Sequence, residues 1–190
     1  IGALALDANT VAVQNTAIGY RALSSNTTGQ LNVAVGDEAL FSNTTADNNT
    51  AIGNDALYAN TTGSHNVAIG ADSLKSNVTG TNIVAVGYGA LENNTASSNV
   101  AVGDNCLNDN TSGSENTAIG RSALAKNTTA SNNTAVGRSA LGNNTTGTGN
   151  VACGYKTLEA NTTSNNSTAF GYECLKASDG GASNVAIGYQ

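Results

Sequence analysis

The sequence predicts an all-β fold, a parallel β-solenoid (β-roll) of about twelve coils with a 17-residue repeat. Three observations support this prediction: a glycine that recurs at a nearly constant interval, two short apolar clusters in each repeat, and polar corners rich in Asn, Thr and Gly between the clusters. They indicate that each repeat forms one coil and that successive coils stack on one another. We therefore expect residues 1–190 to form a single repeat domain.

The recurring glycine usually closes an Ala-Ile-Gly or Ala-Val-Gly triplet. Successive glycines are 17 residues apart, except for one interval of 16 residues. They are Gly2, Gly19, Gly36, Gly53, Gly70, Gly87, Gly103, Gly120, Gly137, Gly154, Gly171 and Gly188. The short interval runs from Gly87 to Gly103, and its missing residue falls after Leu91 in a polar stretch that a loop can absorb.

One repeat reads N-[TV]-A-[IV]-G-x-x-A-L-x-x-N-T-T-x-x-x. The apolar residues do not recur at the i, i+3, i+4, i+7 spacing of a helix, so we expect two short strands per coil, one in each apolar cluster. The glycine and the Asn-Thr-Thr segment would provide the bends. Parallel stacking at about 4.8 Å would align equivalent residues in columns. Stacked Asn side chains would then hydrogen-bond to one another along the solenoid.

Alternation along the first strand predicts which side chains face inward. We expect Ile18, Val35 and their equivalents to point into the coil together with the Leu residues, and the Ala between them to point outward. An outward position that never changes from Ala suggests that the backbone of another subunit packs there; the alternative is that Ala merely suits a tight coil. The candidate subunit interface consists of Ala17, Ala34, Ala51, Ala68, Ala118 and Ala135. The small core of each coil also favours association.

Tyrosine recurs directly after the repeat glycine. These residues are Tyr20, Tyr88, Tyr155, Tyr172 and Tyr189. Aromatic side chains on an exposed edge stack on sugar rings or anchor a protein partner, which makes this edge the candidate ligand-facing surface. The alternative is that Tyr simply covers the edge of the strand.

Composition argues against several classes of partner. The net charge is −6, and seven basic residues scattered along the chain form no basic patch, which argues against nucleic-acid binding. The acidic surface disfavours anionic membranes, and no apolar run approaches the roughly 20 residues that span a bilayer. The chain starts inside a repeat and without Met, so we expect it to be a fragment of a longer fibrous protein.

The sequence predicts no catalytic residue, metal site or cofactor. His65 is the single histidine and lies in a variable corner without evident partners. Carboxylates such as Asp37 follow the glycine, where they would solvate an outer edge rather than line a cleft. Cys106, Cys153 and Cys174 have no metal-ligand spacing and replace recurring small or aliphatic residues, as buried free cysteines do.

The corners contain repeated Asn-x-Thr sequences, for example at Asn26, Asn43, Asn127 and Asn161. In a secreted protein such sites accept N-linked glycans. The alternative is that Asn-Thr-Thr recurs because it forms the turn.

The segments NTAIGYRAL, NVAVGDEAL and NVAIGADSL resemble the head repeats of trimeric autotransporter adhesins of the YadA type, and the N-T-T-G corner is similar to repeats in phage tail-fibre shafts. The resemblance covers nearly the whole chain, from Gly2 to Gly188. It implies a left-handed parallel β-roll, a homotrimer, and a role in adhesion or host attachment. The repeat here is longer than in the adhesins, and Asn replaces their corner glycine.

We therefore expect a non-enzymatic extracellular module on a cell or virion surface: an adhesin head or tail-fibre segment that binds a host surface protein or glycan through many weak contacts. Its rod would be roughly 55 Å long. The alternative is a structural subunit of an extracellular filament that stacks end to end and carries glycans on its corners. Ice binding is disfavoured because Thr and Val alternate irregularly before the strand Ala.

Overall fold

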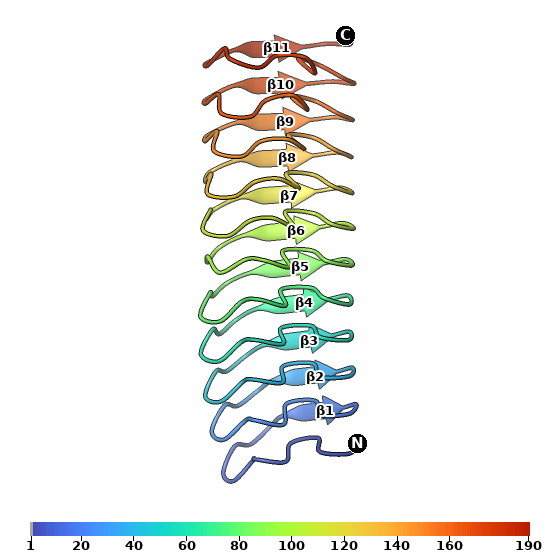
Figure 1. Ribbon diagram of the computed structural model, residues 1–190, viewed down its shortest axis with the longest axis vertical. Coiled ribbons are helices and arrows are strands. Elements are labelled where there is room, and N and C mark those ends of the chain that lie inside the picture. Colours follow the sequence, from blue (N-terminus) through green and yellow to red (C-terminus); the bar gives the residue numbers. More distant parts are fainter. Residues whose placement is uncertain (1) are drawn as a thin grey trace.

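The computed structural model describes residues 2–190, in which eleven short β-strands occur and no helix. The strands are β1 (Thr16–Ile18), β2 (Val33–Val35), β3 (Thr50–Ile52), β4 (Val67–Ile69), β5 (Val84–Val86), β6 (Val100–Val102), β7 (Thr117–Ile119), β8 (Thr134–Val136), β9 (Val151–Cys153), β10 (Thr168–Phe170) and β11 (Val185–Ile187). They form one parallel sheet in chain order, which confirms the predicted solenoid (Figure 1).

Each strand pairs with the equivalent residues of the next coil. Ala17 pairs with Ala34, one repeat later, and this register continues to β11. The short repeat does not disturb it, because Ala85 of β5 pairs with Ala101 of β6, 16 residues away. The missing residue is therefore taken up in a corner, as the sequence predicts. Twelve repeat glycines accompany eleven strands because only Ile1, which lies outside the described residues, precedes the first glycine.

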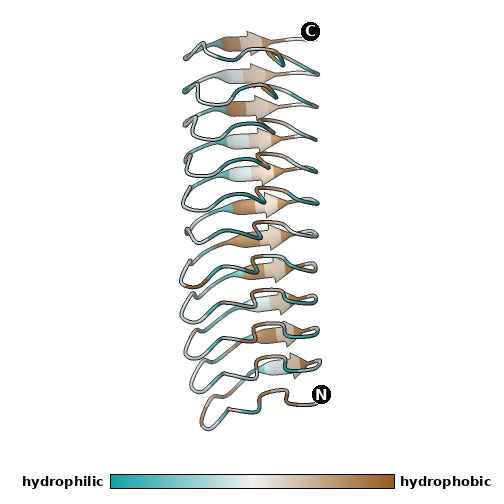
Figure 2. Cartoon of the chain, in the orientation of Figure 1, coloured by the Kyte–Doolittle hydropathy of each residue, from teal (hydrophilic) through white to brown (hydrophobic). Residues whose placement is uncertain are grey.

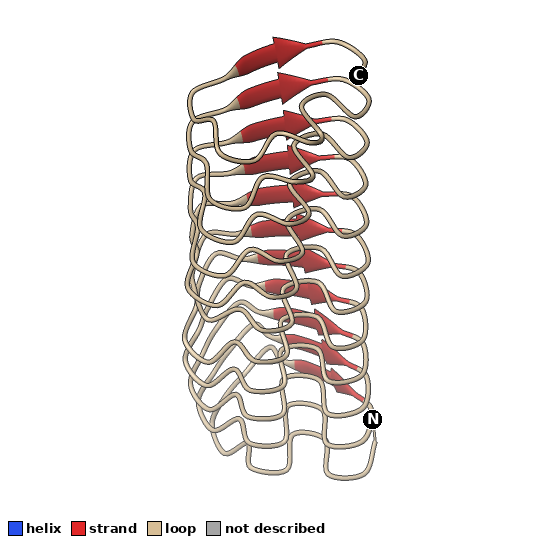
Figure 3. Ribbon diagram, turned by 45° about the horizontal axis from the view of Figure 1, so that its top comes forward, coloured by secondary structure: helices blue, strands red, loops and turns tan. Residues whose placement is uncertain are grey.

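Each coil contains one strand, so the prediction of two strands was wrong. The second apolar cluster has two consecutive residues fully buried, for example Ala22 and Leu23, whereas successive residues of a strand face opposite sides. The left-handed backbone of Leu23, with φ of 55°, turns both side chains inward. This conformation costs about 1–2 kcal/mol, which is offset by about 1.5–3 kcal/mol from burying the leucine. The sheet consequently forms one wall of the solenoid, and loops close the other (Figure 3).

The predicted direction of the strand side chains was also wrong. The strand Ala faces the core, with Ala34 and Ala118 fully buried, whereas Ile18 is 46% exposed. The two walls of the solenoid lie close together: the thiol of Cys106, in the arm opposite the sheet, lies 3.2 Å from the carbonyl oxygen of Ala118 in the strand of the next coil. A residue larger than Ala would not fit between the strand and this arm. A backbone does pack closely against the Ala column, but it belongs to the same chain.

This arrangement overturns the predicted subunit interface. Its residues are buried inside their own coils and offer no side chain to another subunit; they are Ala17, Ala34, Ala51, Ala68, Ala118 and Ala135. With the Leu column they form the core of the solenoid instead.

A column of buried Asn residues, seven positions after the repeat glycine from Asn26 to Asn161, connects the coils; we call it the corner Asn column. The Nδ2 of Asn60 donates to Oδ1 of Asn43 in the preceding coil (3.1 Å) and to the carbonyl of Gly63 in its own coil (2.9 Å). The next residue, Asn77, donates to Oδ1 of Asn60 (3.0 Å). The pattern repeats along the solenoid with one interruption, between Asn77 and Asn94 beside the short corner. The expected Asn side-chain ladder is therefore present.

A second Asn column directly precedes the strands. The Nδ2 of Asn49 donates to the carbonyl of Gly63 (2.9 Å), and its Oδ1 accepts the backbone N–H of Asn66 (3.0 Å). Ile83 replaces this Asn just before the short corner and is fully buried. Among the described residues, no buried side-chain nitrogen or oxygen lacks a hydrogen-bond partner. Hydrogen bonds within the solenoid thus compensate for the water that these amides lose on burial.

The repeat glycines form a column at one corner, where glycine is required for two reasons. Gly70 has φ of +131°, a region that other residues rarely adopt. A Cβ at Gly70 would also lie 2.4 Å from the carbonyl oxygen of Gly87 in the next coil. The coils therefore approach one another too closely at this corner for any side chain.

Candidate functional site

The outer surface of the sheet is an uncharged, largely apolar stripe, which we call the sheet face. It consists of the first residue of every strand, always Thr or Val, and the third residue, which is Ile, Val, Cys or Phe. Ile18, Ile69 and Ile119 of this face are 46%, 37% and 41% exposed. No charged residue occurs in either column from β1 to β11. Figure 2 shows the strands in brown or pale colours against more hydrophilic corners.

The five tyrosines singled out from the sequence do not form one continuous edge. Tyr155, Tyr172 and Tyr189 lie in adjacent coils, with ring centroids 5.0 Å and 5.4 Å apart. Tyr88 and Tyr20 lie four and eight coils from Tyr155, or about 19 Å and 38 Å along the axis. Three of the predicted residues are thus brought together and two stand apart.

A second aromatic cluster lies near the N-terminal end and was missed in the sequence. Phe41 stacks on Tyr58 with ring centroids 5.1 Å apart and planes at 7°. The Arg21 guanidinium lies 5.4 Å from the centroids of both Phe41 and Tyr20, and it contacts the Glu38 carboxylate at 3.1 Å. Phe41 and Tyr58 both stand five positions after the repeat glycine, so comparing repeats at this position would have revealed the pair.

Next to this cluster the surface is hollowed. The hollow has a volume of about 350 Å³ and is lined by Leu4, Asp7, Ala8, Arg21, Ser24, Ser25 and Phe41. It contains one carboxylate and no histidine or cysteine, so it lacks the paired groups needed for acid–base or nucleophilic catalysis.

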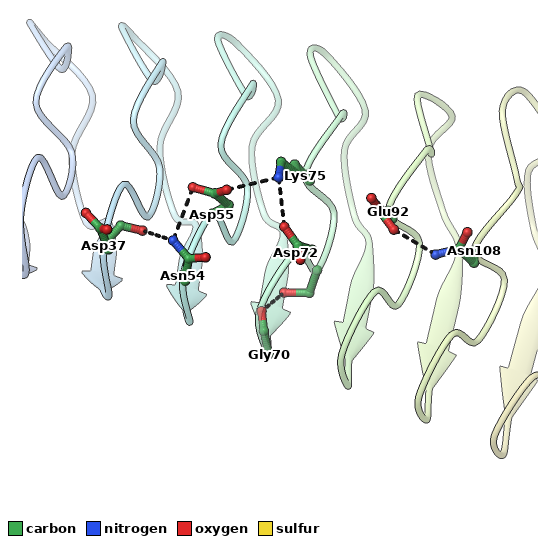
Figure 4. Close-up of polar contacts among 9 residues, drawn as sticks. Asp37, Asn54, Asp55, Gly70, Asp72, Lys75, Glu92 and Asn108 are labelled. Carbon is green, nitrogen blue, oxygen red and sulfur yellow. Dashed lines mark hydrogen bonds and ion pairs between the residues drawn. The ribbon is translucent and has the colours of Figure 1, made fainter.

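Asp55 and Glu92, in the N-terminal half, form carboxylate contacts between coils (Figure 4). The Lys75 ammonium lies 2.9 Å from Asp55 and 2.8 Å from Asp72, which follow neighbouring strands. These two carboxylates raise the pKa of Lys75. One coil further on, Glu92 accepts a hydrogen bond from the Asn108 amide (3.0 Å). The group tethers adjacent coils and provides no cleft for a substrate.

Charge is unevenly distributed along the rod, contrary to the view that the basic residues are scattered. Residues 37–115 contain nine acidic residues and one basic residue, a net charge of 1 − 9 = −8. Residues 121–176 contain five of the seven basic residues and two acidic residues, a net charge of 5 − 2 = +3. Because position along the chain is position along the axis, the solenoid has an acidic part and a basic part (Figure 1).

The cysteines and the histidine do not converge on a reactive site. Burial raises the pKa of the Cys106 thiol to about 12, and Cys174 is also buried. Cys153 is partly exposed on the sheet face, and His65 is exposed at a corner. Within residues 2–190, no group of three or more His, Cys, Asp or Glu side chains is arranged to hold a metal ion.

The Asn-Thr-Thr corners are poor acceptors for glycans in the folded chain. Asn26, Asn43, Asn127 and Asn161 are at most 1% exposed, and their amides are engaged in the corner Asn column. A glycan on any of them would require that coil to open.

Comparisons with protein-family models, curated proteins and solved structures found no match for this chain. In the part of the chain that the structure describes, no helix is long and apolar enough to cross a membrane.

Proposed function

We propose that this chain is a non-enzymatic segment of an extracellular fibre, of the adhesin-head or tail-fibre kind, on a cell or virion surface. In this proposal the solenoid is a stiff spacer, copies associate side by side as a homotrimer, and columns of exposed residues contact the host surface. The left-handed winding implied by the resemblance belongs to the same proposal.

The observation that supports association is the sheet face. Across eleven strands its two columns contain only Thr, Val, Ile, Cys and Phe, whereas the columns after the glycine contain Asp, Glu, Arg and Lys in several coils. Solvent-exposed positions that were free to vary would be expected to include charged residues in some coils. A contiguous exposed apolar surface of this kind is typical of an interaction site.

The dimensions fit a contact between copies. Eleven strands spaced about 4.8 Å apart give a stripe about 50 Å long. With a width of roughly 10 Å the stripe covers about 500 Å², and contacts by flanking columns would bring it toward the roughly 800 Å² per partner of a standard interface. A rod-like partner with the same repeat, such as a second copy, would contact the stripe along its whole length.

The test is the mass of the protein in solution by light scattering, with circular dichroism to verify folding. We expect a β-rich trimer, and we expect Ile69→Lys to dissociate it because an unpaired ammonium would be buried in the apolar contact. The control is Asn105→Lys, which adds the same charge in a column where Lys156 already stands.

A folded wild-type monomer at all concentrations would refute association through the sheet face, as would an Ile69→Lys protein with the mass of the wild type. Polymers that grow with concentration would favour the alternative function, a filament subunit that stacks end to end.

A further inference from the structure

One exposed column changes character along the rod. The residues directly after the glycines of the last five coils are Arg121, Arg138, Tyr155, Tyr172 and Tyr189, an unbroken run that we call the Arg–Tyr column. In the earlier coils the same position holds Tyr, Asp, Asn or Ala. Four of its five members lie in the basic part of the solenoid, Tyr189 lies just beyond it, and successive members are about 4.8 Å apart.

The two arginines are exposed cations without a counter-charge. Neither Arg121 nor Arg138 forms an ion pair with any residue of the described chain, although Arg138 lies 5.7 Å from the ring centroid of Tyr155. By contrast, Lys156 contacts Glu159 at 3.3 Å and Lys176 contacts Glu173 at 2.9 Å. Like charges in neighbouring parallel strands or turns repel each other, so this unpaired arrangement favours an anionic ligand.

The tyrosines extend the same column. Tyr172 and Tyr189 are 48% and 80% exposed, and none of the hydroxyls of Tyr155, Tyr172 and Tyr189 has a hydrogen-bond partner within residues 2–190. Tyr172 and Tyr189 are stacked and Tyr155 is tilted by 32° against Tyr172, so the three rings cover much of one another's faces and present mainly edges and hydroxyls to a ligand. Phenol hydroxyls both donate and accept, as sugar hydroxyls do, while each guanidinium can bind a carboxylate or sulfate through two parallel hydrogen bonds.

We propose that the Arg–Tyr column binds an acidic polysaccharide whose chain runs along the solenoid axis. The carboxylate or sulfate groups contact Arg121 and Arg138, and the adjoining sugar rings contact the tyrosine edges and hydroxyls. This assignment rests on the proposed attachment function and specifies the ligand class for one part of the rod.

The charge distribution favours a polysaccharide over a nucleic acid. Duplex DNA carries one charge per about 1.7 Å, and a strand that extended past the column would meet the net charge of −8 of residues 37–115. A polysaccharide with one acidic group per one or two sugars has a lower charge density and can form neutral contacts with the tyrosines. Anionic membranes meet the same repulsion as DNA.

The experiment measures binding of the whole chain to immobilised polygalacturonate (carboxylated) and heparin (sulfated), with neutral dextran as the reference. We expect binding to one or both anionic polymers and none to dextran, with affinity falling as salt is raised. The double variant Arg121→Asn/Arg138→Asn should bind at least about tenfold more weakly, since two charge-assisted contacts are lost. Asn is tolerated in this column, where Asn54 stands in an earlier coil.

The matched control is Arg21→Asn/Lys75→Asn, which removes the same total charge outside the column and should bind like the wild type. Tyr172→Ala should weaken binding severalfold, whereas Tyr88→Ala, an isolated tyrosine of the same column position, should not. Equal binding by the two double variants would overturn the proposal. Equal retention on dextran, or stronger binding to single-stranded DNA or phosphatidylserine vesicles, would also overturn it. The same holds for a salt-sensitive dimer in which the basic part of one copy pairs with the acidic part of another.

Light scattering on the same proteins separates this proposal from the fibre proposal. Arg121 and Arg138 lie outside the sheet face, so the double variant should keep the mass of the wild type. A protein that assembles but does not bind the anionic polymers would refute the polysaccharide proposal and leave the fibre proposal standing. A monomer that binds the anionic polymers would refute association and leave the polysaccharide proposal standing.

Discussion

The corner Asn column yields the sharpest prediction about stability. The substitution Asn60→Ala deletes three hydrogen bonds, namely those from Asn60 to Asn43 Oδ1 (3.1 Å), from Asn60 to the Gly63 carbonyl (2.9 Å) and from Asn77 to Asn60 Oδ1 (3.0 Å). The Gly63 carbonyl keeps a partner because Asn49 also donates to it. Two buried polar groups are then left unpaired: the Asn43 Oδ1 and one N–H of Asn77.

A buried polar group without a partner costs about 1–3 kcal/mol, so with two such groups we expect Asn60→Ala to lower the free energy of unfolding by about 2–6 kcal/mol. The control is Asn54→Ala in the same coil, directly after Gly53. Its exposed amide makes only 3.4 Å contacts, and Ala71 occupies the equivalent position in the next coil. We expect this control to change stability by less than about 0.5 kcal/mol.

The assay is urea denaturation followed by far-UV circular dichroism, combined with hydrogen exchange to locate the effect. Protection should fall most in β3 and β4, which flank the altered corner. A loss of stability no larger than that of the control would refute the argument that the amide column holds the coils together.

Further predictions concern the glycine column, the cysteines and the charged surface. In urea denaturation, Gly70→Ala should lower the free energy of unfolding far more than Gly180→Ala. Both glycines have positive φ, but a Cβ at Gly70 would collide with the next coil, whereas a Cβ at Gly180 meets nothing within 4 Å. Equal losses of stability would mean that the positive φ, and not the close approach of the coils, makes glycine necessary. Iodoacetamide near pH 8.5 should alkylate Cys153 well before Cys106, as mass spectrometry of peptides would show, because the raised pKa keeps Cys106 a buried thiol. Between pH 9.0 and about 12 the Cys106 thiol ionises in the unfolded chain but stays protonated in the folded one. The free energy of unfolding should therefore be highest below pH 9.0 and decline as the pH rises toward 12. Lys75→Gln should cost at most about 1 kcal/mol, and the cost should vanish at high salt.

Much of the fold could be predicted because the constraints repeat in every coil. The 17-residue period, the glycine required by the close approach of Gly70 to Gly87, and the Asn side-chain ladder all leave an identical residue at the same place in successive repeats. Repetition also located the short coil, and the structure absorbs its missing residue in a corner while keeping the pairing of Ala85 with Ala101.

The candidate sites were less accessible from the sequence because they depend on neighbours in adjacent coils. Contacts such as Arg21 with Phe41 and Lys75 with Asp55 join residues that are 20 residues apart in the chain but adjacent along the axis. The grouping of cations in residues 121–176 can be counted in the sequence, but it becomes a basic part of the rod only because position along the chain is position along the axis. A residue-by-residue search for catalytic motifs does not reveal such columns.

The sequence by itself determined the period, the parallel stacking and the polar corners, because each depends on local turn chemistry repeated in register. The tertiary structure decided which strand face is buried. Alternation places Ala17 opposite Ile18 but does not say which of the two points inward. The narrow gap to the opposite arm decides this, since it admits a methyl group and excludes an isoleucine. The left-handed turn at Leu23, which lets neighbouring Ala and Leu side chains share that gap, is likewise a consequence of packing across the coil.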